Sequence, residues 1–337
     1  MRRIPVALGL VALATMTIGC ADDAPSALRP SGPAAADISV LFWLLLGLGL
    51  AILMIVTAFL LVAGRARTAP VRGPRWLVGS SLSFVVFWAV GVTSVILVVV
   101  LVATIWTGTR TYAAPDTDTD NVTVTVVGHK FWWEVRYDDG ATVTANEITI
   151  PVGRPVSLVL ETDDVIHSFW VPELHGKMDM IPGHTNTFWL QADQPGTYRG
   201  ICAEFCGIQH AQMHFLVHAV DDDEFEAWLD NERADAEPVT DDDAGEAARG
   251  QDVYAEANCI ACHAVQGHFE QQSEVGPDLT HFASRDSLGA GMQDNTRERL
   301  RDWIIDPQAS KPGVRMPPTP LDEPDLEALL DYLETLQ

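Results

Sequence analysis

Two long stretches without a charged residue constrain the fold more than any other feature of this sequence. The first extends from Ile38 to Ala63 and the second from Trp76 to Thr109. Each exceeds the roughly 20 apolar residues that cross a bilayer as a helix. A buried hairpin of a water-soluble domain is a poor alternative at these lengths. The sequence therefore predicts a transmembrane hairpin over residues 38–110, with helices at about 38–63 and 80–107.

The segment between the two stretches determines the orientation of the hairpin. It contains Arg65, Arg67, Arg72 and Arg75 and no acidic residue. Short loops rich in arginine stay in the cytoplasm. We therefore expect the N-terminus and all residues after 110 outside the cytoplasm.

The start of the chain has the pattern of a bacterial export signal. Residues 1–19 combine a positive start with an apolar core. The sequence Thr17-Ile-Gly-Cys20 is similar to a lipobox, in which Cys20 would be lipidated and become the mature N-terminus. Ordinary signal cleavage and an uncleaved segment are the alternatives. Residues 20–37 are rich in small and polar residues and are expected to form a tether.

Soft metal donors are concentrated in one short stretch near the middle of the chain. Its sequence is Cys202-Ala-Glu204-Phe-Cys206-Gly-Ile-Gln-His210-Ala-Gln-Met213, and a further imidazole is available upstream at His167. Thiolate, imidazole and thioether donors select copper over hard ions. Zinc sites seldom recruit methionine, and a disulfide would leave both histidines and the methionine without a role. The pattern predicts a copper site.

The residues around these donors have the alternation of short β-strands. Val122, Val124 and Val126 alternate with threonines, and further short apolar segments continue to Val220. Several short strands separated by turn residues over about a hundred residues are typical of a β-sandwich. We therefore expect an all-β domain over residues 121–220.

An acidic region follows the β domain. Residues 221–246 contain thirteen acids and one arginine. Helical spacing of Phe225, Trp228 and Leu229 predicts a short helix packed on the β domain, and residues 234–244 are expected to form a solvated linker. The net charge of −25 argues against nucleic acid and suits a basic protein partner, or reflects the solubility of an exported domain.

The last part of the chain, residues 245–337, contains a second cofactor motif. Cys259-Ile-Ala-Cys262-His263 resembles the haem attachment site of a small c-type cytochrome. In that family the cysteines form thioethers with the porphyrin, the adjacent histidine is the proximal ligand, and a methionine in a proline-rich loop binds on the other side. Met316 matches that methionine, with His268 and His281 as rivals. Leucines from Leu326 to Leu333 predict an amphipathic helix that crosses the helix of Gly250.

The order of these segments resembles subunit II of a caa₃-type haem–copper cytochrome c oxidase with a cytochrome c domain fused at its C-terminus. The resemblance covers almost the whole chain. It implies a multidomain membrane protein with a two-helix transmembrane hairpin, an all-β cupredoxin-like sandwich and an all-α class I cytochrome c domain. It also implies a protein of the bacterial cytoplasmic (inner) membrane with both cofactor domains outside, and the lipobox-like pattern at Cys20 adds the expectation of a lipoprotein.

The resemblance further implies the ligands of a binuclear copper (CuA) centre. Cys202 and Cys206 would bridge the two ions, with one histidine on each, the sulfur of Met213 on one and the backbone carbonyl of Glu204 on the other. The histidines are His167 and His210. The carboxylate of Glu204 would bind magnesium at the boundary with subunit I, or form a salt bridge there.

The implied role is to pass electrons from a donor through haem c and CuA to haem a of subunit I, where oxygen is reduced to water with proton translocation. The implied partners are subunits I and III, cytochrome c or another respiratory donor, and the bilayer. Alignment on Gly128 places Phe131 where relatives that accept electrons from soluble cytochrome c have a tryptophan, and Trp132 follows. We expect both on the electron path, with a plain core role as the alternative.

Two other functions remain open from the sequence. A CuA-containing nitric oxide reductase subunit would use the same anchor and copper pair with another catalytic partner. A membrane-anchored electron carrier would need no catalytic partner. A quinol oxidase subunit is disfavoured because that branch lacks the copper ligands.

Overall fold

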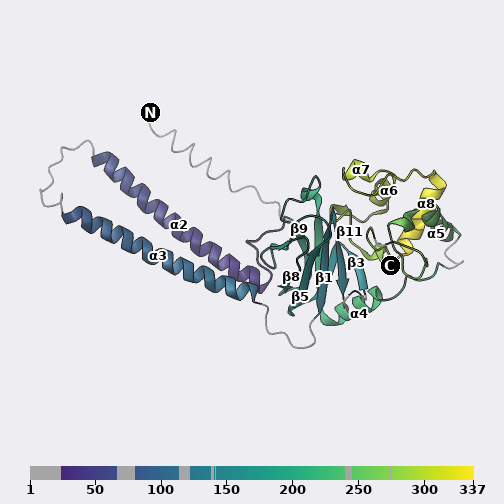
Figure 1. Ribbon diagram of the computed structural model, residues 1–337, viewed down its shortest axis with the longest axis horizontal. Coiled ribbons are helices and arrows are strands. Elements are labelled where there is room, and N and C mark those ends of the chain that lie inside the picture. Colours follow the sequence, from purple (N-terminus) through teal and green to yellow (C-terminus); the bar gives the residue numbers. More distant parts are fainter. Residues whose placement is uncertain are drawn as a thin grey trace.

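The computed structural model describes residues 24–66, 80–113, 122–137, 140, 142–239, 245–273 and 275–337. The predicted export signal, Cys20 and three of the four arginines between the apolar stretches lie outside the described residues. Three parts follow one another along the chain and along the long axis of the molecule, namely a helical hairpin, a β-sandwich and a smaller helical domain (Figure 1).

The hairpin consists of α2 (Pro33–Ala66) and α3 (Ser80–Tyr112), which lie side by side. Both are long and apolar enough to cross a membrane, with mean hydropathies of 2.8 and 2.9. Each helix is longer than its uncharged stretch at the end that meets the β-sandwich. The extra residues of α3 contact the sandwich. The carbonyl of Thr111 accepts hydrogen bonds from Trp189 Nε1 at 2.8 Å and from His175 Nε2 at 3.0 Å.

The β-sandwich is built from two five-stranded sheets. One has the order β3-β2-β1-β5-β8 and the other β4-β10-β9-β6-β7. The strands are β1 (Thr123–His129), β2 (Trp132–Tyr137), β3 (Thr142–Ala145), β4 (Glu147–Pro151), β5 (Val156–Thr162), β6 (His167–Trp170), β7 (Met178–Met180), β8 (Asn186–Leu190), β9 (Gly196–Cys202) and β10 (His214–Val220). The expected all-β sandwich is confirmed.

The core of the sandwich follows from the two-residue period of its strands. Every second side chain of β5 and β10 is buried, because successive residues of a strand point to opposite faces of the sheet. Trp133, Phe169 and Phe215 meet at the centre, with ring centroids 4.6–6.3 Å apart. This aromatic packing lies directly beneath the strand ends that carry the soft donors.

Helix α4 (Asp222–Glu232) joins the β-sandwich to the helical domain. Phe225 and Leu229 are buried and Trp228 packs edge-on against Tyr137, with centroids 5.1 Å apart, so the predicted packing of this helix is correct. The prediction of a solvated linker over residues 234–244 is wrong at Ala236, whereas Ala234, Asp235, Glu237 and Pro238 are exposed. Ala236 is buried and its N–H donates to the carbonyl of Gln266 at 3.0 Å, because this short apolar side chain completes the core of the helical domain.

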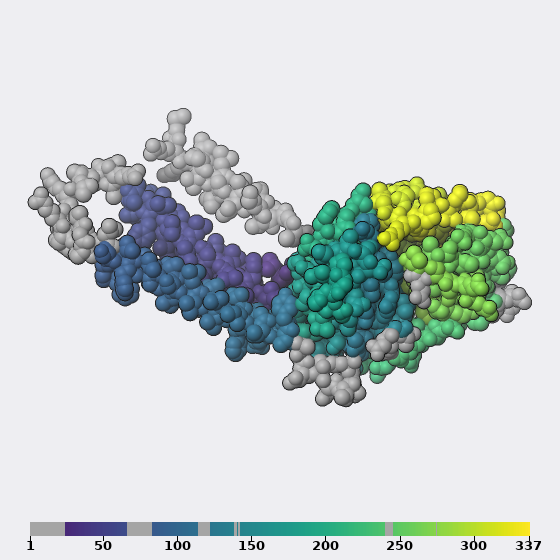
Figure 2. Space-filling model, viewed as in Figure 1, coloured from purple at the N-terminus to yellow at the C-terminus, as the bar shows by residue number. Residues whose placement is uncertain are grey.

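The helical domain contains α5 (Glu246–Glu256), α6 (Arg297–Ile305), α7 (Pro307–Ser310) and α8 (Glu323–Thr335), with a minor pair β11 (Ser287–Leu288) and β12 (Gln293–Asp294). Helices α5 and α8 cross at Gly250. A Cβ atom there would lie 1.9 Å from the carbonyl oxygen of Ala328, so only glycine permits the approach. The predicted crossing is confirmed, and the domain lies directly against the sandwich (Figure 2).

Candidate metal centre and haem site

The candidate metal centre lies in the loop between β9 and β10. These strands pair in antiparallel fashion, with His214 opposite Ile201. The backbone N–H of Cys202 donates to the carbonyl of Met213 at 3.0 Å, so the two ends of the loop are held together. A short 3₁₀ helix, His210–Gln212, turns the chain back toward β10. The sheet thereby fixes the first and last donors of the motif relative to each other.

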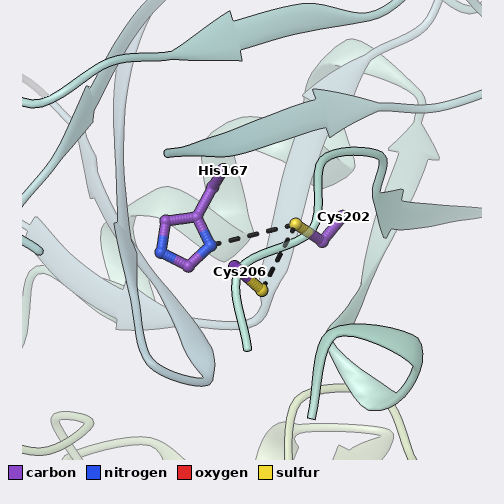
Figure 3. A group of neighbouring side chains, drawn as sticks. All are labelled: His167, Cys202 and Cys206. Carbon is purple, nitrogen blue, oxygen red and sulfur yellow. Dashed lines mark hydrogen bonds between the residues drawn. The ribbon is translucent and has the colours of Figure 1, made fainter. Parts of the chain in front are cut away.

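The two thiols form the middle of the donor group. Their sulfur atoms lie 3.8 Å apart, and each has its own imidazole. The Nδ1 atom of His167 lies 3.8 Å from Cys202, and that of His210 lies 3.9 Å from Cys206. The sulfur of Met213 lies 3.8 Å from Cys206 on one side, and the carbonyl oxygen of Glu204 lies 3.2 Å from Cys202 on the other. Figure 3 shows three members, His167 from β6 and both cysteines, with the imidazole nitrogen directed at the Cys202 thiol.

His167, Cys202, Cys206 and Met213 are buried and His210 is half-buried, and neighbouring residues orient the ring of His167. The ring of His167 fills the space beside Gly128, where a Cβ atom would come within 2.9 Å of it. Asp164 contacts the other ring nitrogen, Nε2, at 2.9 Å and also accepts the N–H of Lys130 at 2.8 Å. A carboxylate in this position leaves Nδ1 free to act as a ligand. Sequence reasoning missed Asp164, although an acid three residues before a candidate ligand is a usable signal.

The ionisation of this group also suits a metal. Burial opposes charge on His167, but its pKa is raised by hydrogen bonds to the Cys202 thiol and to Asp164. The two thiols share a proton, so contact with Cys206 lowers the pKa of Cys202, while contact with Cys202 and burial raise that of Cys206. Two neighbouring buried thiols do not both lose their protons easily, because the two negative charges repel each other. A bound metal cation stabilises both as thiolates. Sulfur and imidazole donors on this pattern fit copper.

The candidate haem site is a cavity in the helical domain. Its walls include Cys259, Cys262, His263 and Met316, together with apolar side chains such as Leu300, Ile304 and Leu329. The Nδ1 atom of His263 lies 2.7 Å from the carbonyl oxygen of Pro277. Because neutral imidazole donates through one nitrogen only, Nε2 is free for a metal. An apolar cavity with this donor set fits a haem attached through both cysteines.

The two rival histidines lie elsewhere. His268 contacts the hydroxyl of Tyr332 at 2.8 Å and the carbonyl of Glu237 at 2.9 Å. His281 contacts the carbonyls of Gln337 at 2.8 Å and Ala234 at 3.0 Å. Both ring nitrogens of each histidine are thus engaged in structural hydrogen bonds, and neither residue lines the cavity. The arrangement favours Met316 as the ligand opposite His263.

The aromatic residues and Glu204 have different surroundings. Phe131 and Trp132 come from the β-sandwich, yet both line the haem cavity. The Phe131 ring also lies over Gly207 in the metal loop, about 3.0 Å from a Cβ position there. Trp132 stacks on His129 at 4.5 Å. The carboxylate of Glu204 is 46% exposed and lies 3.6 Å from the amino group of Lys177, as an ion pair.

Comparisons with known proteins found relatives of both cofactor domains. The family profile described as cytochrome c oxidase subunit II, periplasmic domain, matches residues 141–220, and the cytochrome c profile matches residues 247–337. A protein named cytochrome c oxidase subunit 2 from Alkalihalophilus pseudofirmus is 37% identical over 98% of this chain and 96% of its own length. A namesake from Bacillus subtilis is 28% identical over 99% and 98%. The crystal structure of the periplasmic domain of subunit II of cytochrome oxidase from Bradyrhizobium japonicum superposes with a TM-score of 0.34, at 29% identity over 36% of this chain and 96% of that one.

The similarity to the first two relatives extends from the apolar hairpin to the end of the helical domain. The metal loop and the haem cavity therefore lie inside a single match, in the order hairpin, sandwich and helical domain. The chain belongs to the cytochrome c oxidase subunit II family, in the caa₃-type form that carries its own cytochrome c domain.

Proposed function

We propose that the loop between β9 and β10, together with His167, holds a binuclear copper centre. The bridging ligands are Cys202 and Cys206, whose sulfurs lie between the two imidazoles. The remaining ligands are His167, His210, the sulfur of Met213 and the carbonyl oxygen of Glu204. The central position of the thiols is the observation that favours two shared sulfurs over one mononuclear site.

We further propose that the helical domain carries a covalently bound haem c. Cys259 and Cys262 form the thioethers, His263 is the proximal ligand and Met316 binds from the opposite side. The carbonyl of Pro277 orients His263 through its contact with Nδ1. A histidine and methionine pair raises the reduction potential of a haem, which suits delivery of electrons to an oxidase.

As subunit II of a haem–copper terminal oxidase, the chain passes electrons to subunit I, where oxygen is reduced. When bound, haem and copper supply the one-electron centres for this relay. The observation that supports direct electron transfer between haem and copper is a contact between the two sites. The side-chain amide of Gln209, inside the copper loop, donates to the carbonyl of Pro312 at 2.6 Å, and Pro312 lies four residues before Met316.

Phe131 and Trp132 are proposed to line the path between the two centres. Both line the haem cavity, and Phe131 also contacts the copper loop at Gly207. The helical domain therefore covers the place on the sandwich where an external donor would otherwise bind. We expect the donor, cytochrome c or another respiratory protein, to reduce the haem domain first.

The assembly proposed is a bacterial oxidase of the cytoplasmic (inner) membrane, with subunits I and III as partners and both cofactor domains outside. Cys20 is proposed to carry lipid, which mass spectrometry of the mature N-terminus tests. A magnesium ion on Glu204 requires further ligands from subunit I, because within this chain the carboxylate has an ion pair with Lys177.

Purification of the intact complex tests the function. We expect oxygen uptake with a reduced donor, a mixed-valence copper signal in electron paramagnetic resonance, and a haem that stays on this chain after denaturation. A chain that purifies without a large haem-bearing subunit would contradict the oxidase assignment. A nitric oxide reductase would show turnover with nitric oxide and none with oxygen.

A further inference from the structure

The junction between the sandwich and the helical domain contains a lysine that is almost fully buried. Lys311 lies directly after α7 and is 1% exposed. Its amino group donates to the carbonyl of Gly289 in its own domain at 2.6 Å and to the carbonyl of Phe131 in the sandwich at 3.0 Å. One ammonium group thus joins the two domains through backbone acceptors.

A lysine buried at a domain junction is unusual and calls for a physical explanation. Burial of an ammonium group is costly unless its donors are satisfied, and burial lowers the pKa of Lys311 to about 7. An apolar residue of similar length would avoid that cost but would leave two buried carbonyls without a donor. The hydrogen bonds also have a fixed direction, which an apolar contact lacks. Directional contacts define the orientation of one domain on the other.

The position of Lys311 in the chain connects it to both cofactor sites. The next residue, Pro312, accepts the hydrogen bond from Gln209 in the copper loop, and Met316 follows in the same segment. On the sandwich side, Phe131 supplies the carbonyl to Lys311 while its ring lies over Gly207. The lysine therefore lies between the segment that carries the haem ligand and the loop that carries the copper ligands.

Further contacts hold the rim of the same junction. The backbone N–H of His214, next to the copper ligand Met213, donates to the carbonyl of Ala290 at 2.9 Å. Arg199 donates to the carbonyl of Gly291 at 3.0 Å. At the opposite end, Glu147 accepts from the N–H of Ser287 at 2.9 Å and from its hydroxyl at 2.7 Å. These contacts join the same two domains as Lys311 and describe one docked orientation.

We propose that Lys311 is a positioning residue that locks the haem domain on the copper domain, so that electrons pass between them in this docked orientation without movement of the haem domain. The proposal rests on the copper and haem sites proposed above. It differs from a tethered domain that swings between donor and copper. The packing of residues 234–239 on the haem domain shortens the free part of the connection and agrees with a fixed arrangement.

The test compares Lys311→Met with the wild type in the intact oxidase. The methionine retains length but removes the donors. The matched control is Arg249→Met, which removes a cation of the same domain that pairs with Asp325 at the surface. A third variant, Lys311→Arg, retains a cationic donor.

Two measurements report on docking and on its consequence. Hydrogen exchange of the junction amides of His214 and Ser287 measures docking directly. The rate at which an electron equilibrates between haem and copper after rapid photoreduction measures the consequence. In Lys311→Met we expect faster exchange at both amides and about tenfold slower equilibration, because both hydrogen bonds donated by the Lys311 amino group are lost. The haem potential and the copper signal should stay unchanged, and Lys311→Arg should recover part of the rate.

Opposite results overturn the proposal. One is wild-type amide exchange and a wild-type rate in Lys311→Met. Another is equal impairment in the methionine and arginine variants, which would assign the effect to packing. Faster electron transfer after release of the domain would favour a swinging tether. Absence of the copper signal or of attached haem in the wild type would refute the proposed function instead, and amide exchange would still report on the docking.

Discussion

The copper loop and the haem cavity hold their cofactors by different means. The sulfur and imidazole donors of the copper loop lie 3.8–3.9 Å from one another within the protein itself. The candidate haem ligands, His263 and Met316, come from separate segments that line one cavity. The sandwich therefore builds its metal site as part of its own core, whereas the helical domain surrounds a group that completes its core.

The hydrophobic cores show the physical reason for this difference. Cys202, Cys206 and Met213 belong to the same buried cluster as Trp133 and Phe215, so these three donors are part of the hydrophobic core of the sandwich. In the helical domain, core residues such as Leu300, Ile304 and Leu333 also line the cavity. Their apolar surface is covered when a haem fills the space. Loss of one ligand should consequently have different results in the two domains.

The largest effect is expected for Cys202→Ser or Cys206→Ser. In the proposed binuclear centre each thiolate would bridge both metal ions, and a hydroxyl is a hard, weak substitute for it. The mixed-valence copper signal should disappear, while covalent haem remains on the chain at its normal potential. Electron paramagnetic resonance and a haem stain on the same sample check this. An unchanged copper spectrum in either variant refutes the copper assignment.

A smaller effect is expected for Met316→Ala. Attachment depends on Cys259 and Cys262, so the haem should remain bound. Its reduction potential should fall on the order of 0.1 V, within the ~0.8 V range that axial ligands span. The sulfur-to-iron band at the red end of the oxidised spectrum should vanish, and the copper signal should be unchanged. Persistence of that band would identify another residue as the ligand.

Asp164→Asn tests whether the copper site is held by its surroundings. The asparagine keeps the shape but removes the charge that contacts Nε2 of His167. Changes of this kind typically cost about 10–100-fold in metal affinity. Copper should still bind, with lower affinity in competition against a chelator. Full wild-type affinity would show that the sheet alone orients His167. Asp222→Asn is a control, since Asp222 pairs with Arg154 in an exposed ion pair that includes none of the ligands.

The smallest effect concerns the pH dependence of the domain junction. Burial raises the pKa of Glu147, but hydrogen bonds from His218 and Ser287 outweigh this effect and lower it. Burial lowers the pKa of His218, but its contact with Glu147 outweighs this effect and raises it. Because the pKa of Glu147 is lowered, its contribution to stability is lost as pH falls below about 4.5. Because the pKa of His218 is raised, its contribution is lost as pH rises above about 6.5. The pair should stabilise the junction most between these limits.

Amide exchange at Ser287 between pH 4 and pH 9, corrected for intrinsic exchange, measures this window. In Glu147→Gln the window should flatten, because the charged partner is gone. A junction equally stable at pH 5.5 and pH 9 in the wild type would contradict the assignment. Arg299→Gln, a change at an exposed ion pair with Asp294, should leave the profile as it is.

The apolar hairpin, the β-strands and the two cofactor motifs could be predicted from local patterns in the sequence. Charge-free stretches of sufficient length define the hairpin, because no water-exposed helix could carry so much apolar surface. The copper and haem motifs are local, so spacing alone brings Cys202 near Cys206 and His263 next to Cys262. The two-residue alternation around Val124 indicates strands for the same reason, since strand geometry repeats over neighbouring residues.

The contacts between the domains could not be predicted from the sequence and became visible only in the three-dimensional structure. Lys311 and Phe131 are 180 residues apart, and no local pattern relates a lysine to a backbone carbonyl at such a distance. The acidic composition of residues 234–244 predicted a solvated linker, yet Ala236 is buried in a core assembled from distant helices. Composition describes the average preference of a segment, whereas a contact depends on which surface folds against it. For that reason the two cofactor motifs were readable in the sequence, and the junction that places one against the other was not.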